Sequence, residues 1–175
     1  MPSQRYNPND KPLRISSCDC PECCAACTNS PGWFMPTEIP RLAEYLGLSI
    51  EETFRKKLAI GVTSTGGSTL RHGVMPHKLR DNKKPGSLWS LGEVAQPGRC
   101  VFYDQGRCSI HPVRPFECAR MIHGSGHDAV ALRHTIIEFW DDKALAPFAK
   151  LTGRRLFGKS KPKGPRPRPR SRRNK

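Results

Sequence analysis

Hydrophobic residues in the first half of the chain recur at the spacing of short helices. Within residues 37–47 an apolar side chain returns every third or fourth position, Thr37 stands where an N-cap residue is expected, and Gly47 can end the helix. Ser49 and Glu52 then have the spacing of a capping box. The pattern therefore predicts two short helices in succession.

A second pattern, of short β-prone runs, begins near residue 99. Two such runs flank residues 104–106, which read Asp-Gln-Gly, and this predicts a β-hairpin. The hairpin would hold Cys100 and Cys108 near opposite ends of a two-stranded ribbon, close in space. The segment that follows contains two prolines, so we expect it to be extended and turn-like and to fold Cys118 back.

Helical spacing returns from Asp128 onward. A weaker helix is expected over residues 144–151, where Pro147 either starts or breaks it. The predicted buried face of the first of these two helices consists of Leu132, Ile136, Phe139 and Trp140.

Residues 61–98 lack such periodicity and are rich in Gly, Ser and Lys. We expect a long connection, of the kind that is functional or mobile in a compact domain. Its GVTSTGGS stretch has the glycines of a phosphate-binding loop, but Gly67 stands where the phosphate-binding lysine is required. No clear strand precedes the stretch, so nucleotide binding is not predicted.

Composition limits the size of the core. The 175 residues suit one domain, but only 36% of them are hydrophobic, and 15 are Gly and 17 are Pro. We therefore expect an α+β fold: a small, irregular domain with short helices and a β-hairpin. A core this small usually needs disulfides or a structural metal.

Eight cysteines in two groups are the candidates for that role. Five lie in residues 18–28 and three in residues 100–118. No secretory signal and no apolar run long enough to span a membrane is visible, so we expect a cytoplasmic protein with reduced thiols. Adjacent Cys23 and Cys24 are also too close for ordinary disulfide geometry. Metal binding is therefore favoured over disulfides.

The spacing of the cysteines is typical of metal ligands. Cys20 and Cys23 form one C-x2-C knuckle, Cys24 and Cys27 form a second directly after it, and C-x7-C-x9-C follows downstream. Soft thiolates suit zinc, iron or an iron–sulfur cluster. Four thiolates around a divalent ion leave a net negative charge, which nearby cations and N–H groups must offset.

The positive charge of the chain is concentrated at its end. Residues 159–175 hold nine Lys and Arg, four Pro and no acid, so they account for more than half of the net charge of +15. Such a tail is expected to be disordered. It could contact nucleic acid or an acidic protein, or only aid solubility, and it has no aromatic residue on which bases could stack.

Two stretches resemble a known family. CPECC, with Cys20, Cys23 and Cys24, and the run CVFYDQGRCSIHPVRPFEC, with its Arg-Pro pair, are similar to the CxxCxxCC (YkgJ-like) family of zinc- or iron-chelating cysteine-cluster proteins. Glu38 matches the acidic residue with which members of the family open a helix. The resemblance covers roughly residues 18–123.

The resemblance implies a metal centre made of cysteines. Cys18 stands only two positions before Cys20 where the family has three, and Cys27 lies outside the pattern but could replace Cys18 as a ligand. His111, three positions after Cys108, could add a ligand, although a polar surface role is favoured. The cysteines that match the family directly are Cys20, Cys23, Cys24, Cys100, Cys108 and Cys118.

Three hypotheses for function follow. The first is a metal-binding protein without catalysis, and the second is a metal-dependent or iron–sulfur enzyme, because the family is similar in part to flagellin lysine-N-methylases. The third is a nucleic-acid-associated protein that acts through its tail. The sequence identifies no catalytic residue. The expected organisation is an irregular arm (1–17), a cysteine-cluster domain (18–158) and the tail (159–175).

Overall fold

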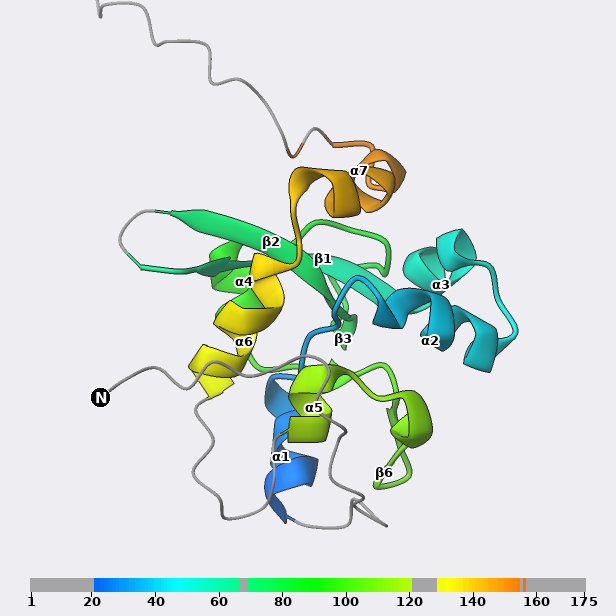
Figure 1. Ribbon diagram of the computed structural model, residues 1–175. Helices are drawn as coiled ribbons and strands as arrows, with labels where there is room; N and C mark the ends of the chain where they lie inside the picture. Colours follow the sequence, from blue (N-terminus) through cyan, green and yellow to red (C-terminus); the bar gives the residue numbers. More distant parts are fainter. Residues whose placement is uncertain (1–20, 67–68, 121–128, 155, 157–175) are drawn as a thin grey trace, which may run out of the picture.

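The computed structural model describes residues 21–66, 69–120, 129–154 and 156. The expectations for the N-terminal arm, Cys18, Cys20 and the basic tail lie outside these residues. Within them the chain forms an α+β fold of short helices and small antiparallel strand pairs (Figure 1).

Helices lie at both ends of the described chain, and the strands lie between them without forming one large sheet. The helices are α1 (Pro21–Asn29), α2 (Glu38–Leu46), α3 (Ile50–Lys57), α4 (Leu91–Ala95), α5 (Phe116–Arg120), α6 (Ala129–Glu138) and α7 (Asp142–Leu151), with a 3-10 turn η1 (His111–Val113). The strands are β1 (Leu58–Ser64), β2 (Leu70–Pro76), β3 (Lys78–Leu79), β4 (Arg99–Cys100), β5 (Tyr103–Asp104) and β6 (Arg107–Cys108). They pair as β1–β2, β3–β4 and β5–β6.

The β1–β2 hairpin lies in the middle of the fold, where the sequence predicted a long connection. That prediction was wrong because glycines interrupt both apolar runs. Gly61 and Gly73 are opposite each other in the register, and a Cβ at either would lie 2.7 Å or 3.1 Å from ring atoms of Trp33. The glycines that hide the strand pattern therefore make room for the tryptophan ring.

Helices α2 and α3 follow the predicted pattern closely. Ser49 and Glu52 form the expected capping box, and Gly47 ends α2 with a positive φ of 64°. Thr37 makes no side-chain capping bond in the described part of the chain. Instead a carboxylate oxygen of Glu38 accepts the Met35 N–H at 2.7 Å. Thr37 therefore holds the predicted N-cap position of α2 without forming the side-chain bond expected of it.

The predicted buried face of helix α6 and the residues after it is correct except for Phe139. Leu132 and Ile136 are buried, whereas Phe139 is 44% exposed. The helix ends at Glu138, so Phe139 no longer follows helical spacing, while Trp140 turns inward and donates its Nε1–H to the Phe34 carbonyl at 2.7 Å. The second helix, α7, is present with Pro147 inside it.

The predicted turn at residues 104–106 is confirmed, because β5 and β6 pair there and Gly106 has a φ of 79°. Cys100, however, lies outside that ribbon, in β4, where it pairs with Lys78 of β3. The segment leading to Cys118 is also more helical than predicted, since it contains η1 and then α5.

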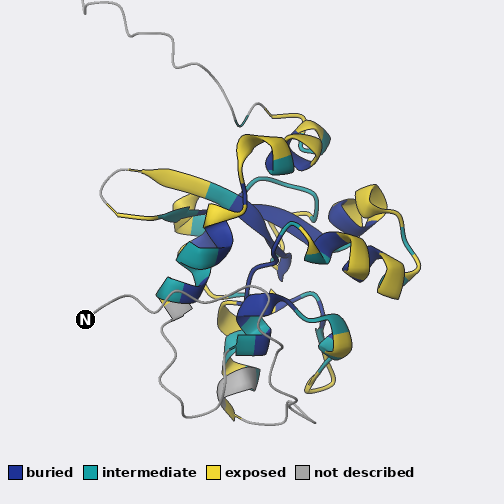
Figure 2. Ribbon diagram, viewed as in Figure 1, coloured by how far each residue is buried: buried dark blue, intermediate teal, exposed yellow. Residues whose placement is uncertain are grey.

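The core lies where the hairpin meets the surrounding helices (Figure 2). Its largest buried side chains include Trp33, Trp89, Trp140, Phe34 and Phe54. Helices α1 and α5 and strand β6 lie together at one end of the molecule (Figure 1), and they carry Cys27, Cys118 and Cys108.

Candidate metal centre

Cysteines that are far apart in sequence are carried to this end by different elements. Cys24 and Cys27 lie three positions apart on α1, so helical geometry puts them on the same face. Cys100 ends β4, Cys108 ends β6 and Cys118 lies within α5. Four separate elements therefore contribute thiols.

The thiols lie close enough for their charges to interact. Burial raises the pKa of Cys100 to about 12, and the neighbouring charges of Cys27 and Cys108 raise it further. Burial also raises the pKa of Cys118 well above its usual value, with further contributions from Cys100, Glu117, Cys27 and Cys108. Without a cation, Cys100 and Cys118 are therefore neutral thiols at neutral pH, and a bound metal ion would favour their thiolates.

A glycine makes room for one of these thiols. A Cβ at Gly32 would lie 2.7 Å from the backbone nitrogen of Cys118 and 2.8 Å from its Sγ. Both distances are shorter than real contacts of a Cβ. Gly32 therefore allows the chain leaving α1 to lie directly against α5.

A buried ion pair fixes the other side of α5. Arg133 of α6 donates to Glu117 at 2.6 Å, and Glu117 also accepts the backbone N–H of Trp33 at 2.8 Å. The guanidinium carbon of Arg133 lies 5.1 Å from the centroid of the Trp33 ring. Burial raises the pKa of Glu117, and the Arg133 charge opposes this. Sequence reasoning missed both residues, because neither has a distinctive spacing.

Lys78 is a second buried cation near the thiols. Its side chain is 1% exposed, and its Nζ donates to the carbonyls of Val94 and Gln96, each at 2.6 Å, and of Asn29 at 3.4 Å. Burial is the main reason that its pKa is lowered to about 8. Lys78 thus joins the ends of α1 and α4 beside Cys100, its partner in the β3–β4 pair.

Two residues that match the family motif support the backbone between Cys108 and Cys118. Glu38 accepts backbone N–H groups from Met35 and Phe116, and burial raises its pKa to about 7. Arg114 donates to the carbonyl of His111 at 2.8 Å. These contacts hold the helix starts and the turn in place.

His111 was considered as an additional ligand. Its Nε2 is buried and has no hydrogen-bond partner among the described residues, while its Nδ1 lies 3.4 Å from a guanidinium nitrogen of Arg114. Burial and the Arg114 charge lower the pKa of His111. An unpartnered imidazole nitrogen is compatible with a ligand, and this role stays a prediction.

The complete ligand set is not fixed by these contacts. Among the residues whose side chains are described, no group of three or more Cys, His, Asp or Glu is placed so that it could hold a metal ion. The side chain of Cys23, like residues 18 and 20, lies outside that description. The donor chemistry nonetheless suits a soft ion, since thiols are the groups that gather here.

Comparison with known proteins agrees with this chemistry. The profile of the CxxCxxCC family, described as a putative zinc- or iron-chelating domain, matches residues 17–135, which is more than half of the chain. No curated protein and no solved structure gives a match. No helix in the described ranges is long and apolar enough to cross a membrane. The chain therefore belongs to the CxxCxxCC family of zinc- or iron-chelating domains.

Proposed function

We propose that the protein binds a zinc or iron ion through the thiolates of Cys27, Cys100, Cys108 and Cys118. The observation that carries this proposal is that thiols from α1, β4, β6 and α5 lie at one end of the fold, near enough for Cys27 and Cys108 to raise the pKa of Cys100 and Cys118. Four thiolates are the usual complement of a structural zinc site and of an iron–sulfur cluster.

The proposed role of the ion is structural. Helix α1 has only nine residues, and most of those whose side chains are described are exposed or only partly buried. A helix this short is marginal on its own in water. An ion shared between Cys27 and the later cysteines would fasten α1 to the rest of the fold, so that metal-binding energy becomes folding energy.

The negative charge of such a centre would be offset by groups already present. Lys78 and Arg133 are both buried or largely buried cations on elements that contact the cysteine-bearing segments. Glu117 neutralises Arg133, so Lys78 supplies the remaining positive charge. This arrangement supports a centre that carries excess negative charge, as a tetrathiolate site does.

The remaining cysteines of the motif are proposed as ligands of a second or shared ion. Cys20 and Cys23 form a C-x2-C knuckle directly before Cys24, and Cys18 lies just before them. Together with the first four they would make one polynuclear site or two separate ones. A metal-to-chain ratio above one would support this extension, and a ratio of one would contradict it.

Single substitutions of the four thiols by serine test the main proposal. Full-length protein is purified under reducing, oxygen-free conditions and titrated with Co²⁺, whose thiolate charge-transfer absorbance reports sulfur ligation. Each serine variant should lose most of this absorbance at equal protein and metal concentrations. Ala25→Ser introduces the same hydroxyl on an exposed position of α1 and should change nothing. Unchanged absorbance in any of the four variants removes that cysteine from the site.

A further inference from the structure

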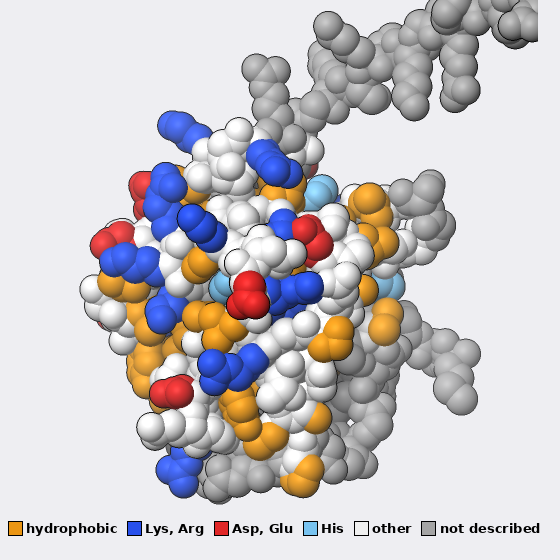
Figure 3. Space-filling model, turned by 180° about the vertical axis from the view of Figure 1, so that it is seen from behind, with side chains coloured by type: hydrophobic (Ala, Val, Ile, Leu, Met, Phe, Trp, Pro, Cys, Tyr) orange, Lys and Arg blue, Asp and Glu red, His pale blue; other side chains and the backbone are white. Residues whose placement is uncertain are grey.

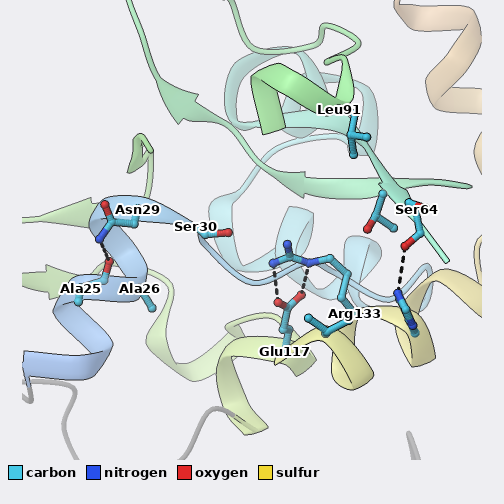
Figure 4. A pocket seen from close by; sticks show the side chains of 11 residues that line it. Ala25, Ala26, Asn29, Ser30, Ser64, Leu91, Glu117 and Arg133 are labelled. Atoms are coloured by element: carbon cyan, nitrogen blue, oxygen red, sulfur yellow. Dashed lines mark hydrogen bonds and ion pairs between the residues drawn. The ribbon is translucent and has the colours of Figure 1, made fainter. Parts of the chain in front are cut away.

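A cavity of about 760 Å³ lies between α1, α6 and the end of β1 (Figure 4). It is distinct from the thiol cluster, because helical geometry puts Ala25, Ala26 and Asn29 on the face of α1 opposite Cys24 and Cys27. Its volume is in the range of pockets that bind small molecules. Its lining residues are Ala25, Ala26, Asn29, Ser30, Thr63, Ser64, Leu91, Glu117, Val130, Arg133 and His134.

The walls and rim of this cavity are mostly apolar. Ala25 and Ala26 face it from α1, and Leu91 and Val130 stand at its rim with 45% and 61% of their surfaces exposed. Exposed aliphatic side chains beside a cavity favour a ligand with an apolar body, because binding would remove both from water.

The floor of the cavity offers a hydrogen-bond donor. Two nitrogens of Arg133, Nε and Nη2, face Glu117 at 3.4 Å and 2.6 Å. The third nitrogen, Nη1, has no hydrogen-bond partner among the described residues and points away from Glu117 in Figure 4. Its N–H groups are thus available to an acceptor on a ligand.

The charge of that acceptor follows from the ion pair. Glu117 is 1% exposed and already neutralises Arg133, so a ligand carboxylate at Nη1 would lie near a buried carboxylate without a cation of its own. A ligand cation would face the guanidinium directly. A neutral carbonyl is repelled by neither Glu117 nor Arg133, and it can accept a hydrogen bond from the remaining N–H donor of Arg133.

We propose that this cavity binds a small neutral molecule that combines an apolar aliphatic body with an amide-type carbonyl. The carbonyl accepts a hydrogen bond from Nη1 of Arg133, and the apolar body lies against Ala26, Leu91 and Val130. Thr63 and Ser64 add hydroxyl groups at the same end of β1 for further polar atoms of the ligand.

The probe is N-acetyl-L-leucinamide, with N-acetyl-L-leucine and L-leucinamide as anionic and cationic analogues of nearly the same shape. Each is titrated into ¹⁵N-labelled full-length protein while backbone amide shifts are followed. The neutral probe should give saturable shifts at Ala26, Ser64 and Val130, and both charged analogues should bind more weakly. Absence of saturable shifts there, or tighter binding of the anion, overturns the proposal.

Two variants separate the donor from the apolar rim. Arg133→Lys keeps a cation opposite Glu117 but removes Nη1, and it should weaken the neutral probe about fivefold, the effect of one hydrogen bond. Leu91→Ser alters only an exposed rim residue and should weaken it about threefold. Leu70→Ser is the matched control, since Leu70 is 52% exposed and lies outside the cavity.

Metal content is measured on each variant, so that an effect on the metal centre is told apart from an effect on the cavity. Equal probe binding by wild type and Arg133→Lys, with Leu91→Ser also unaffected, overturns the proposal. That result would leave the metal centre untouched. Conversely, if the protein contains no metal as purified and still binds the probe, only the proposed metal centre is contradicted.

Discussion

At the scale of single residues, the close packing of α5 against the chain after α1 depends on Gly32, which has no side chain. Gly32→Ala would put a Cβ 2.7 Å from the backbone nitrogen of Cys118, and backbone cannot move aside as a side-chain end can. We expect the free energy of unfolding to fall by roughly 1–3 kcal/mol and metal content to decrease. Denaturant unfolding and elemental analysis measure the two effects.

The control for this substitution is Gly92→Ala. Gly92 lies in α4, and a Cβ there would meet no atom within 4 Å, so alanine should be neutral or slightly stabilising. If Gly32→Ala is as well tolerated as Gly92→Ala, the close packing of α5 against the chain after α1 is wrong.

Glu38 should make stability depend on pH. Burial raises its pKa from 4.5 to about 7, so the folded protein binds a proton more tightly than the unfolded chain does. Its contribution to stability is therefore full below about pH 4.5 and is lost as pH rises toward 7. Relative to Glu38→Gln, wild type should lose up to about 3 kcal/mol across this range. Parallel pH profiles of the two proteins, in the same metal buffer, give the difference.

The opposite slope, or identical profiles, would mean that the Glu38 carboxyl is not buried against Met35 and Phe116. Because the measurement compares two proteins with the same cysteines, the pH dependence of the thiols largely cancels.

At the scale of elements, Lys78 connects the ends of two helices to the strand that carries Cys100. Lys78→Met would leave the carbonyls of Val94 and Gln96 without their donor, while the Asn29 carbonyl would keep only the Gly98 N–H. We expect a loss of about 2–4 kcal/mol in the free energy of unfolding, together with weaker metal binding. Thermal unfolding and competition with a metal-binding dye provide the readouts.

Lys84→Met makes the same substitution at an exposed position and should have little effect. A Lys78→Met protein that resembled this control would show that the Val94 and Gln96 carbonyls are satisfied in another way.

The elements that could be predicted from the sequence are those with local signals. The capping box at Ser49, the turn at residues 104–106 and the spacing of Leu132 and Ile136 all act within a few positions of the chain. The family and its zinc- or iron-chelating chemistry were likewise recognisable from cysteine spacing.

The elements that were missed depend on contacts between distant residues. The β1–β2 hairpin contains glycines because Trp33 needs the space, and α1 lies within a stretch that was interpreted only as a run of ligands. Lys78, Glu117 and Arg133 have partners 16 or more residues away, so no local pattern could reveal them. Cys27, which departs from the family pattern, is one of the thiols whose charges act on Cys100 and Cys118.

At the scale of the whole molecule, charge is unevenly divided between the described fold and the tail. Figure 3 shows Lys and Arg side chains scattered among Asp and Glu on one face, with no single continuous basic surface. The hypothesis of nucleic-acid contact depends on the composition of residues 159–175, which lie outside the described residues. It stays a prediction from composition.

The fold as a whole combines a well-formed hydrophobic core with one end where thiols gather. Trp33 and the hairpin belong to the core, whereas α1 contacts β4 and is joined to the fold through the chain around Gly32 and through Lys78. Removal of the metal should thus loosen α1 and the segment from Cys100 to Cys118 before it affects the hairpin.

The most direct test is the metal content of full-length protein purified without oxygen or added chelator, measured together with its circular dichroism. We predict at least one zinc or iron per chain, and a loss of helical signal and thermal stability when a strong chelator removes it. Fully reduced protein that contains no transition metal and yet keeps the same spectrum and melting temperature would contradict the proposed thiolate centre.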